Sequence, residues 1–219
     1  MGKWLSNPLD NPLVWRTSRW LFDLTLGLYR RRFRLLRRWG VLEGDPSVLD
    51  IGCGVGPYAR VTRGPYLGID LNERYIRCAA RLYRGTNCRF RRADVTTLSR
   101  EHKTYNLALL VDFLHHLPDN AAVTILREAW RLADGQVICF EPVRQQTNVV
   151  GRWLIAHDRG DFMRPLEELH GLFERAGLPI GESRELYLGL LRTRAILCRK
   201  GAAARLPRRT RVLQEAGCS

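Results

Sequence analysis

The sequence lacks the features that place a chain in a membrane or in an oxidising compartment. It has no run of 18 consecutive apolar residues, so it offers no candidate membrane-spanning helix. Asn7, Pro8, Asp10 and Pro12 interrupt the N-terminus, which therefore does not read as a signal peptide. The six cysteines include no Cys-x-x-Cys pair, so neither a metal site nor a disulfide framework is predicted. We expect a cytoplasmic protein with reduced thiols.

Lysine is scarce, and nearly all of the positive charge comes from arginine. The 219 residues contain 3 lysines and 33 arginines, a ratio typical of GC-rich bacterial coding, and the net charge is +14. Residues 1–40 carry 9 basic and 2 acidic side chains and residues 199–219 carry 6 and 1, whereas residues 41–198 carry 21 and 19. The basic ends suit nucleic acid, anionic lipid or plain solvent. We predict an N-terminal helical segment (1–40), a folded domain (41–199) and a basic tail (200–219).

The most informative run is VLDIGCGVG at residues 48–56, an apolar strand that leads directly into a glycine-rich turn. The glycines alternate in this turn: Gly52, Gly54 and Gly56. Glycine lets the backbone turn sharply and approach a ligand where a Cβ atom would collide. A dinucleotide-binding fingerprint needs its third glycine at the position of Pro57. With the carboxylate of Asp50 nearby to accept hydrogen bonds from an amine, the loop suits an amino-acid-bearing nucleoside better than a pyrophosphate.

Three later apolar strands are also associated with acidic residues. The segment 66–70 ends in Asp70, the segment 90–95 ends a third strand in Asp94, and the segment 105–111 is followed by Asp112. One such aspartate is usually a helix cap or turn residue, but three in order favour a ligand site. An acid at the end of the second strand can bind both hydroxyls of a ribose, and Asp94 is placed to meet the exocyclic amine of an adenine.

These motifs resemble the class I S-adenosylmethionine-dependent methyltransferases, in the branch with small-molecule, quinone and lipid methyltransferases. The matching pieces are VLDIGCGVG, GID (68–70), RRAD (91–94), LLVDFLHHLPD (109–119) and GQVICFEP (135–142). The resemblance implies an α/β fold: a Rossmann-like sheet of seven mostly parallel strands, helices on both faces, a closing antiparallel hairpin and an extra N-terminal helix. It places the methyltransferase domain at 41–199, with S-adenosylmethionine as its cofactor.

The resemblance also assigns the cofactor site residue by residue. It places Asp50 and the first two glycines at the methionine part of the cofactor and the backbone around Asp112 at the methionine end. Asp70 would bind the ribose, and Asp94 with Val95 would bind the adenine. The full set of predicted cofactor residues is Asp50, Gly52, Cys53, Gly54, Asp70, Leu71, Asp94, Val95, Asp112 and Phe113.

The acceptor side is less specific in sequence. A histidine near neutrality can remove a proton from the acceptor, and arginines can clamp a carboxylate or phosphate. We predict proton-transfer roles for His116, His157 and Asp158. We predict acceptor contacts from Tyr29, Arg30, His115, Glu141, Arg159 and Arg164. Two alternatives stay open: one of the paired histidines only shapes the site, and residues 157–164 form a solvated loop whose ion pairs cap the following helix.

Residues 14–39 are predicted to form an amphipathic helix, bent at Gly27. Its apolar stripe is Trp15, Phe22, Leu26, Tyr29, Phe33 and Leu36, and most of its arginines lie off that stripe. This helix has three interpretations: a cover for the sheet or substrate pocket, a peripheral membrane contact, or a nucleic-acid contact. We favour the cover.

Further elements complete the predicted fold: helices at 119–132 and 165–176, a strand at 136–141, and strands at 182–188 and 190–199 that form a hairpin. We predict methyl transfer to oxygen or nitrogen of a small-molecule or lipid-like acceptor. One alternative is an RNA methyltransferase, against which no Asn/Asp-Pro-Pro-aromatic motif follows the fourth strand. The other is a non-catalytic S-adenosylmethionine-binding protein that engages a membrane or partner. The sequence leaves the oligomeric state open.

Overall fold

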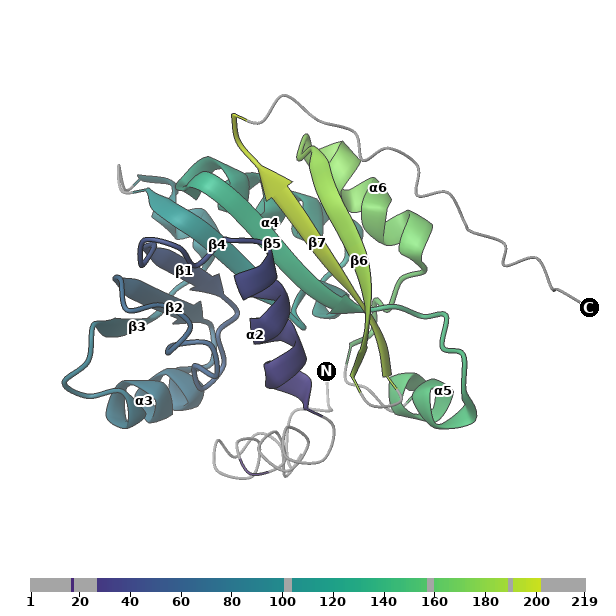
Figure 1. Ribbon diagram of the computed structural model, residues 1–219, viewed down its shortest axis with the longest axis horizontal. Helices are drawn as coiled ribbons and strands as arrows, with labels where there is room; N and C mark the ends of the chain where they lie inside the picture. The colour runs from purple at the N-terminus through teal and green to yellow at the C-terminus, as the bar shows by residue number, and fades with distance from the viewer. Residues whose placement is uncertain (1–16, 18–26, 101–103, 157–159, 189–190, 202–219) are drawn as a thin grey trace, which may run out of the picture.

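Seven strands form one mixed sheet in the order β3-β2-β1-β4-β5-β7-β6 (Figure 1). The computed structural model describes residues 17, 27–100, 104–156, 160–188 and 191–201. The strands are β1 (Val48–Ile51), β2 (Tyr66–Asp70), β3 (Cys88–Arg92), β4 (Tyr105–Val111), β5 (Ala133–Pro142), β6 (Ile180–Leu188) and β7 (Leu191–Arg199). Strands β1 to β5 are parallel, and β7 is antiparallel to both of its neighbours. The predicted fold class, including the closing hairpin, is confirmed.

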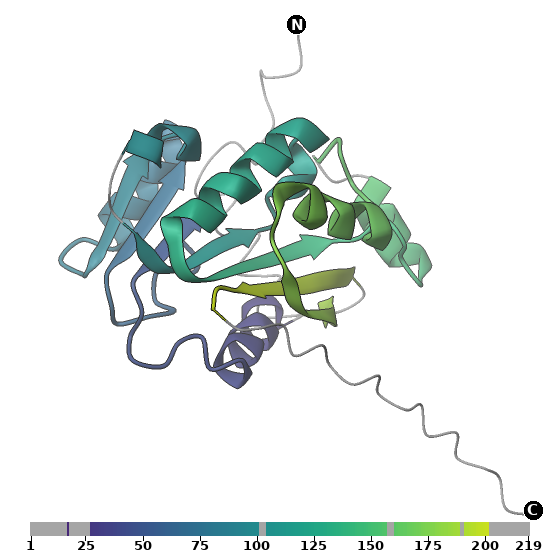
Figure 2. The same cartoon turned by 90° about the horizontal axis from the view of Figure 1, so that it is seen from above.

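Helices cover both faces of this sheet. The α-helices are α2 (Leu28–Arg38), α3 (Glu73–Leu82), α4 (Asp119–Leu132), α5 (Val149–Ala156) and α6 (Leu166–Ala176), and two short 3-10 helices are η2 (Val95–Arg100) and η3 (Leu114–His116). Figure 2 shows α4 and α6 on one face and the purple helix α2 on the other. None of the helices in the described residues is both long and apolar enough to span a membrane.

The strand side chains alternate between two apolar cores. Along β4, Ala108 and Leu110 point into the core under α4 and α6, whereas Leu107 and Leu109 point into the core under α2. Parallel strands buried on both faces read as continuous apolar runs, which is why the sequence marks β4 so clearly. Because α2 contributes Leu36 and neighbouring side chains to the second core, residues 28–39 are integral to the folded domain.

Helix α2 has the predicted apolar stripe, and it also contains one buried arginine that was not predicted. Gly27 precedes it with a left-handed φ of 63°, at the position where the sequence predicts a bend. Tyr29, Phe33 and Leu36 pack against the core, and the arginines off the stripe are exposed. Arg32, in contrast, is 1 % exposed and points inward. The rest of the predicted helix lies outside the described residues, except for Thr17.

Candidate active site

The glycine loop after β1 has the backbone that its sequence predicts. Gly52, Gly54 and Gly56 all have positive φ values, of 73°, 56° and 77°. A Cβ atom on Gly52 would lie 2.3 Å from the Cδ2 atom of Phe113, and one on Gly56 would lie 2.7 Å from the ring of Phe90. Only glycine satisfies both the left-handed backbone and this close packing.

Asp70 ends β2 and anchors the glycine loop. Its Oδ2 atom accepts a hydrogen bond from the Gly54 N–H at 2.9 Å, and its Oδ1 atom accepts one from the Asn72 N–H at 2.8 Å. Burial raises the pKa of Asp70, while these backbone bonds act in the opposite direction. Each carboxylate oxygen accepts more than one hydrogen bond, so Asp70 keeps capacity for hydroxyl groups. Leu71 beside it is 65 % exposed, which leaves an apolar surface at the same edge.

Asp50 lies beneath the loop rather than on its surface. Its side chain is buried, and the Tyr66 hydroxyl donates to its Oδ2 atom at 2.5 Å. Burial raises the pKa of Asp50 to about 7, against the lowering effect of the Tyr66 hydrogen bond. The nearby charge of Asp70 adds to the increase. A poorly solvated carboxylate of this kind gains from a cation bound close to it.

The segment after β3 brings Asp94 to the same edge of the sheet. The strand ends at Arg92, two residues before Asp94, which lies in a turn. Its Oδ1 atom accepts hydrogen bonds from both the N–H and the hydroxyl of Thr96, each at 2.9 Å. Asp94 is half-buried and Val95 is buried. The turn therefore has a defined shape before any ligand binds.

The loop after β4 uses its own polar groups internally. Asp112 has a left-handed φ of 49°, and its carboxylate accepts two hydrogen bonds from Arg32, at 2.9 and 2.6 Å. The Asp112 N–H donates to the Phe140 carbonyl, and the Phe113 N–H donates to Glu141. The backbone N–H groups that the family resemblance assigns to the methionine end are thus bonded within the protein.

Glu141 and His115 support this loop, in contrast to the acceptor contacts expected from the sequence. The Oε1 atom of Glu141 accepts the N–H groups of Phe113 and Leu114 at 2.7 and 2.6 Å. Its Oε2 atom lies 2.7 Å from the Nδ1 atom of His115. Both side chains are buried, and Glu141 bonds the N–H groups at the start of η3. Their placement corresponds to the alternative that one of the paired histidines shapes the site.

Arg164 is also turned inward, which corrects its expected role as an anion clamp. Its guanidinium donates to the carbonyls of Leu114, Leu117 and Phe162. It also pairs with Asp119 at the start of α4, with Nη2 to Oδ1 at 2.8 Å. Its Nε, Nη1 and Nη2 atoms are all engaged, so Arg164 joins the η3 loop to the segment before α6. Its ion pair is with Asp119 of α4, so it does not cap the following helix α6, as the alternative of a solvated loop expected.

Of the remaining acceptor-side residues, three are described in the structure and three are not. His116 is exposed, and its ring centroid lies 4.1 Å from that of His115. Tyr29 is half-buried against Tyr58, and Arg30 is exposed. His157, Asp158 and Arg159 lie outside the described residues.

The sequence reasoning missed Arg32, Tyr58 and Tyr66. Tyr58 accepts a hydrogen bond from Arg32 at 3.3 Å, and Tyr66 bonds Asp50. Helical periodicity carries a signal for Arg32, since it lies three residues after Tyr29 and four before Leu36, on the apolar stripe.

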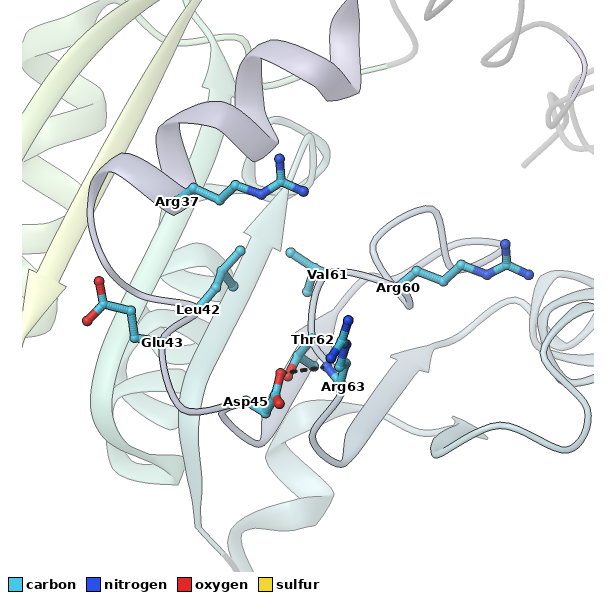
Figure 3. A pocket seen from close by; sticks show the side chains of 8 residues that line it. All are labelled: Arg37, Leu42, Glu43, Asp45, Arg60, Val61, Thr62 and Arg63. Carbon is cyan, nitrogen blue, oxygen red and sulfur yellow. Dashed lines mark hydrogen bonds between the residues drawn. The ribbon is translucent and has the colours of Figure 1, made fainter.

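The described residues contain no group of three His, Cys, Asp or Glu side chains arranged as a metal site. A hollow of about 390 Å³ does exist, lined by Arg37, Leu42, Glu43, Asp45, Arg60, Val61, Thr62 and Arg63 (Figure 3). It lies beside the segments that precede β1 and β2, at the amino ends of these strands. The acids and glycines described above lie at the carboxyl ends, where open α/β sheets bind ligands. The hollow is therefore separate from the candidate active site.

Comparisons with known proteins agree with this geometry. Residues 48–134 match a family model described as "Methyltransferase domain". A solved S-adenosylmethionine-dependent methyltransferase from Methanosarcina mazei is 20% identical, with 74% of this chain and 95% of that chain covered and a TM-score of 0.63. Magnesium protoporphyrin IX methyltransferase from Synechocystis, solved with bound S-adenosylhomocysteine, is 18% identical, covers 90% of both chains and has a TM-score of 0.59.

A putative O-methyltransferase from Nostoc punctiforme is 18% identical, covers 90% of this chain and 62% of that chain, and has a TM-score of 0.66. At these identities the solved structures establish a shared fold. A search of curated proteins finds no match to the sequence.

The matched residues run from β1 to the start of β5 and include the glycine loop and the acids at the strand ends. Residues 48–134 therefore match a methyltransferase domain, and the chain shares the fold of solved S-adenosylmethionine-dependent methyltransferases. The predicted enzyme class and cofactor agree with these matches.

Proposed function

We propose that this enzyme transfers the methyl group to an oxygen or nitrogen atom of a small-molecule or lipid-like acceptor. One observation carries the choice of acceptor. Among the described residues, all exposed large apolar side chains except Leu82 follow the carboxyl ends of strands or lie near the β6–β7 turn. They are Leu71, Val149, Val150, Trp153, Phe162 and Tyr187. An apolar surface beside the cofactor edge favours an acceptor with a substantial apolar part.

The cofactor lies, in this proposal, across the carboxyl ends of β1, β2, β3 and β4. The glycine loop holds the methionine part, including Gly52, Cys53 and Gly54, and the buried charge of Asp50 attracts the ammonium group. Asp70 binds the ribose, and Leu71 packs on the cofactor. Asp94 and Val95 hold the adenine.

The chemistry needs little from the protein beyond position. The sulfonium methyl group is already electrophilic, so the acceptor atom has to be held in line at about 3 Å in a site without bulk water. A hydroxyl or protonated amine must also lose a proton. We assign this step to His116, the exposed last residue of η3, with His157 and Asp158 as further candidates. His115 and Glu141 orient the loop that carries His116.

Peripheral membrane contact is a second part of the proposal, for a cytoplasmic enzyme that reaches lipid-like acceptors. Helix α5 presents Trp153 and two valines, and the exposed Arg152 lies beside them. Apolar side chains next to arginines suit an anionic bilayer surface. In vesicle co-sedimentation, Trp153→Ser should weaken binding to anionic vesicles, whereas Leu82→Ser on α3 should leave it unchanged. Equal binding of both variants would contradict the proposed membrane contact.

The main experiment measures binding and transfer separately. S-adenosylhomocysteine should raise the melting temperature of the chain, and NAD should not. Radiolabelled methyl transfer from S-adenosylmethionine should then be screened with phenols, amines and isoprenoid-like compounds, with RNA as the competing substrate. Transfer to RNA alone, with steep salt dependence, would overturn the acceptor class. His116→Asn should lower the rate by about 100-fold with an active acceptor, whereas the control His170→Asn on α6 should not.

A further inference from the structure

Arg32 is a buried cation with an unusual set of partners. Its Nη1 and Nη2 atoms donate to both carboxylate oxygens of Asp112, and Nη1 also donates to the hydroxyl of Tyr58 at 3.3 Å. The Cζ atom lies 5.3 Å from the centroid of the Phe140 ring. Burial lowers the pKa of Arg32, but the charges and hydrogen bonds of Asp112 and Tyr58 together outweigh it, and the net shift is upward. The side chain is a permanent cation under α2.

Stability alone does not explain this arrangement. Buried ion pairs lose much of their attraction to the cost of removing both charges from water. The Nε atom of Arg32 is buried and has no hydrogen-bond partner among the described residues, which adds a further penalty. Asp112 also adopts a left-handed backbone that non-glycine residues rarely take. Energetically unfavourable features such as these are frequent at functional sites, where the surrounding structure holds a group in place.

Arg32 holds Asp112, the first residue of the loop after β4. Asp112 is followed by Phe113, and a Cβ atom on Gly52 would lie only 2.3 Å from the Cδ2 atom of its ring. Glu141 holds the Phe113 N–H from below. A continuous series of contacts therefore runs from Arg32 through Asp112 and Phe113 to the glycine loop.

The same helix also reaches the acceptor edge. The neighbouring Arg31 donates from Nη1 to the carbonyl of Tyr187 at 2.7 Å, near the turn between β6 and β7 (Figure 1). Tyr187 belongs to the exposed apolar set at the acceptor edge. Helix α2 thus contacts both the loop that holds Phe113 and the hairpin beside the acceptor surface.

We propose that Arg32 is a positioning residue that couples α2 to the cofactor loop, by holding Asp112 in its left-handed conformation and Phe113 against Gly52. This inference rests on the cofactor site proposed above. It assigns to the N-terminal helix a part in cofactor binding, in addition to its role in covering the sheet. Loss of the pair loosens the loop and weakens the affinity for S-adenosylhomocysteine.

The test uses a double variant of the full chain, Arg32→Met with Asp112→Asn. It removes both charges together, and asparagine tolerates the left-handed conformation well. We expect the Kd for S-adenosylhomocysteine, measured by calorimetry well below the melting temperature, to rise at least 10-fold. The conservative Arg32→Lys variant should restore part of the affinity. Arg34→Met is the matched control, because Arg34 lies on the same helix but is exposed.

The outcomes separate the inference from the proposed function. A double variant that folds and binds like the wild type overturns the inference. Should the double variant not fold, Arg32→Lys decides: a weaker affinity at an unchanged melting temperature supports the inference, and an unchanged affinity overturns it. A wild-type chain that does not bind S-adenosylhomocysteine overturns the proposed cofactor site instead.

Discussion

The two halves of the cofactor edge use charged residues in different ways. Around β1 and β2, Asp70 bonds the backbone of the glycine loop and keeps acceptor capacity for a ligand. Around β4 and β5, the charged groups of Asp112, Glu141 and Arg164 are paired inside the protein. The first half is built from a turn that only glycine allows. The second half is an irregular loop, which needs buried polar side chains to bond its backbone groups.

The largest effect should come from removing the central support of the second half. Glu141→Ala leaves two buried N–H groups and His115 without their partner, so we expect a loss of about 3–5 kcal/mol in the free energy of unfolding. Urea denaturation measures this loss. Glu174→Ala, at an exposed position on α6, is the control and should change stability by less than about 0.5 kcal/mol. A small effect of Glu141→Ala would show that the loop does not depend on its carboxylate.

The first half should respond to pH through Asp50. The pKa of Asp50 is about 7 in the folded protein and 3.8 ordinarily, so the folded state holds the proton more tightly. The protonated carboxyl therefore stabilises the fold below about pH 4, and this contribution is lost as the pH rises through about 7. Between pH 5 and pH 8 the loss should be about 3 kcal/mol. Asp50→Asn should flatten this part of the stability profile, and an unchanged profile would contradict the assignment.

Asp70→Ala should separate binding from folding in the first half. We expect the affinity for S-adenosylhomocysteine to fall by about 100-fold, which corresponds to about 2.7 kcal/mol, because the proposed ribose contacts and the anchor of the Gly54 N–H would both be lost. Calorimetry of the variant measures this, with Glu43→Ala at the opposite edge as control. Retained affinity in Asp70→Ala would place the ribose elsewhere.

The smallest effect is expected at Asp94. Asp94→Ala removes the acceptor for the Thr96 N–H and hydroxyl, and we expect a loss of about 1 kcal/mol in stability, as for other lost caps. If Asp94 also binds the adenine, the affinity for S-adenosylhomocysteine should decrease as well, while Asp134→Ala should preserve it. Thermal unfolding with and without the ligand measures both effects. A stability loss without an affinity loss would limit Asp94 to a turn role.

The sequence predicted most of the fold because its signals are local. Apolar runs marked β1, β2 and β4, and helix α4 has the bounds that periodicity predicts, residues 119–132. The third strand was predicted to end at Asp94, but β3 ends two residues earlier, at Arg92, and Asp94 lies in the turn that follows. The glycines of the cofactor loop were also predictable, because a left-handed backbone demands that residue type.

The acceptor side was harder to predict for a physical reason. A charged residue looks the same in sequence whether it faces a ligand or a buried backbone group. Glu141, His115 and Arg164 were expected to meet the acceptor, and the structure turns them to the η3 loop. Arg32 was counted among the charges of a basic helix, although its position on the apolar stripe predicts burial.

By itself, the sequence determined the strands, the glycine turn and the acids at the strand ends, and with them the class of enzyme and its cofactor. These features depend on backbone conformation and on residue spacing, which are local properties of the chain. Only the tertiary structure decided which charges pair with one another. Residues 32 and 112 are far apart in the chain, and the burial of the Arg32 guanidinium requires an opposite charge such as Asp112 beside it.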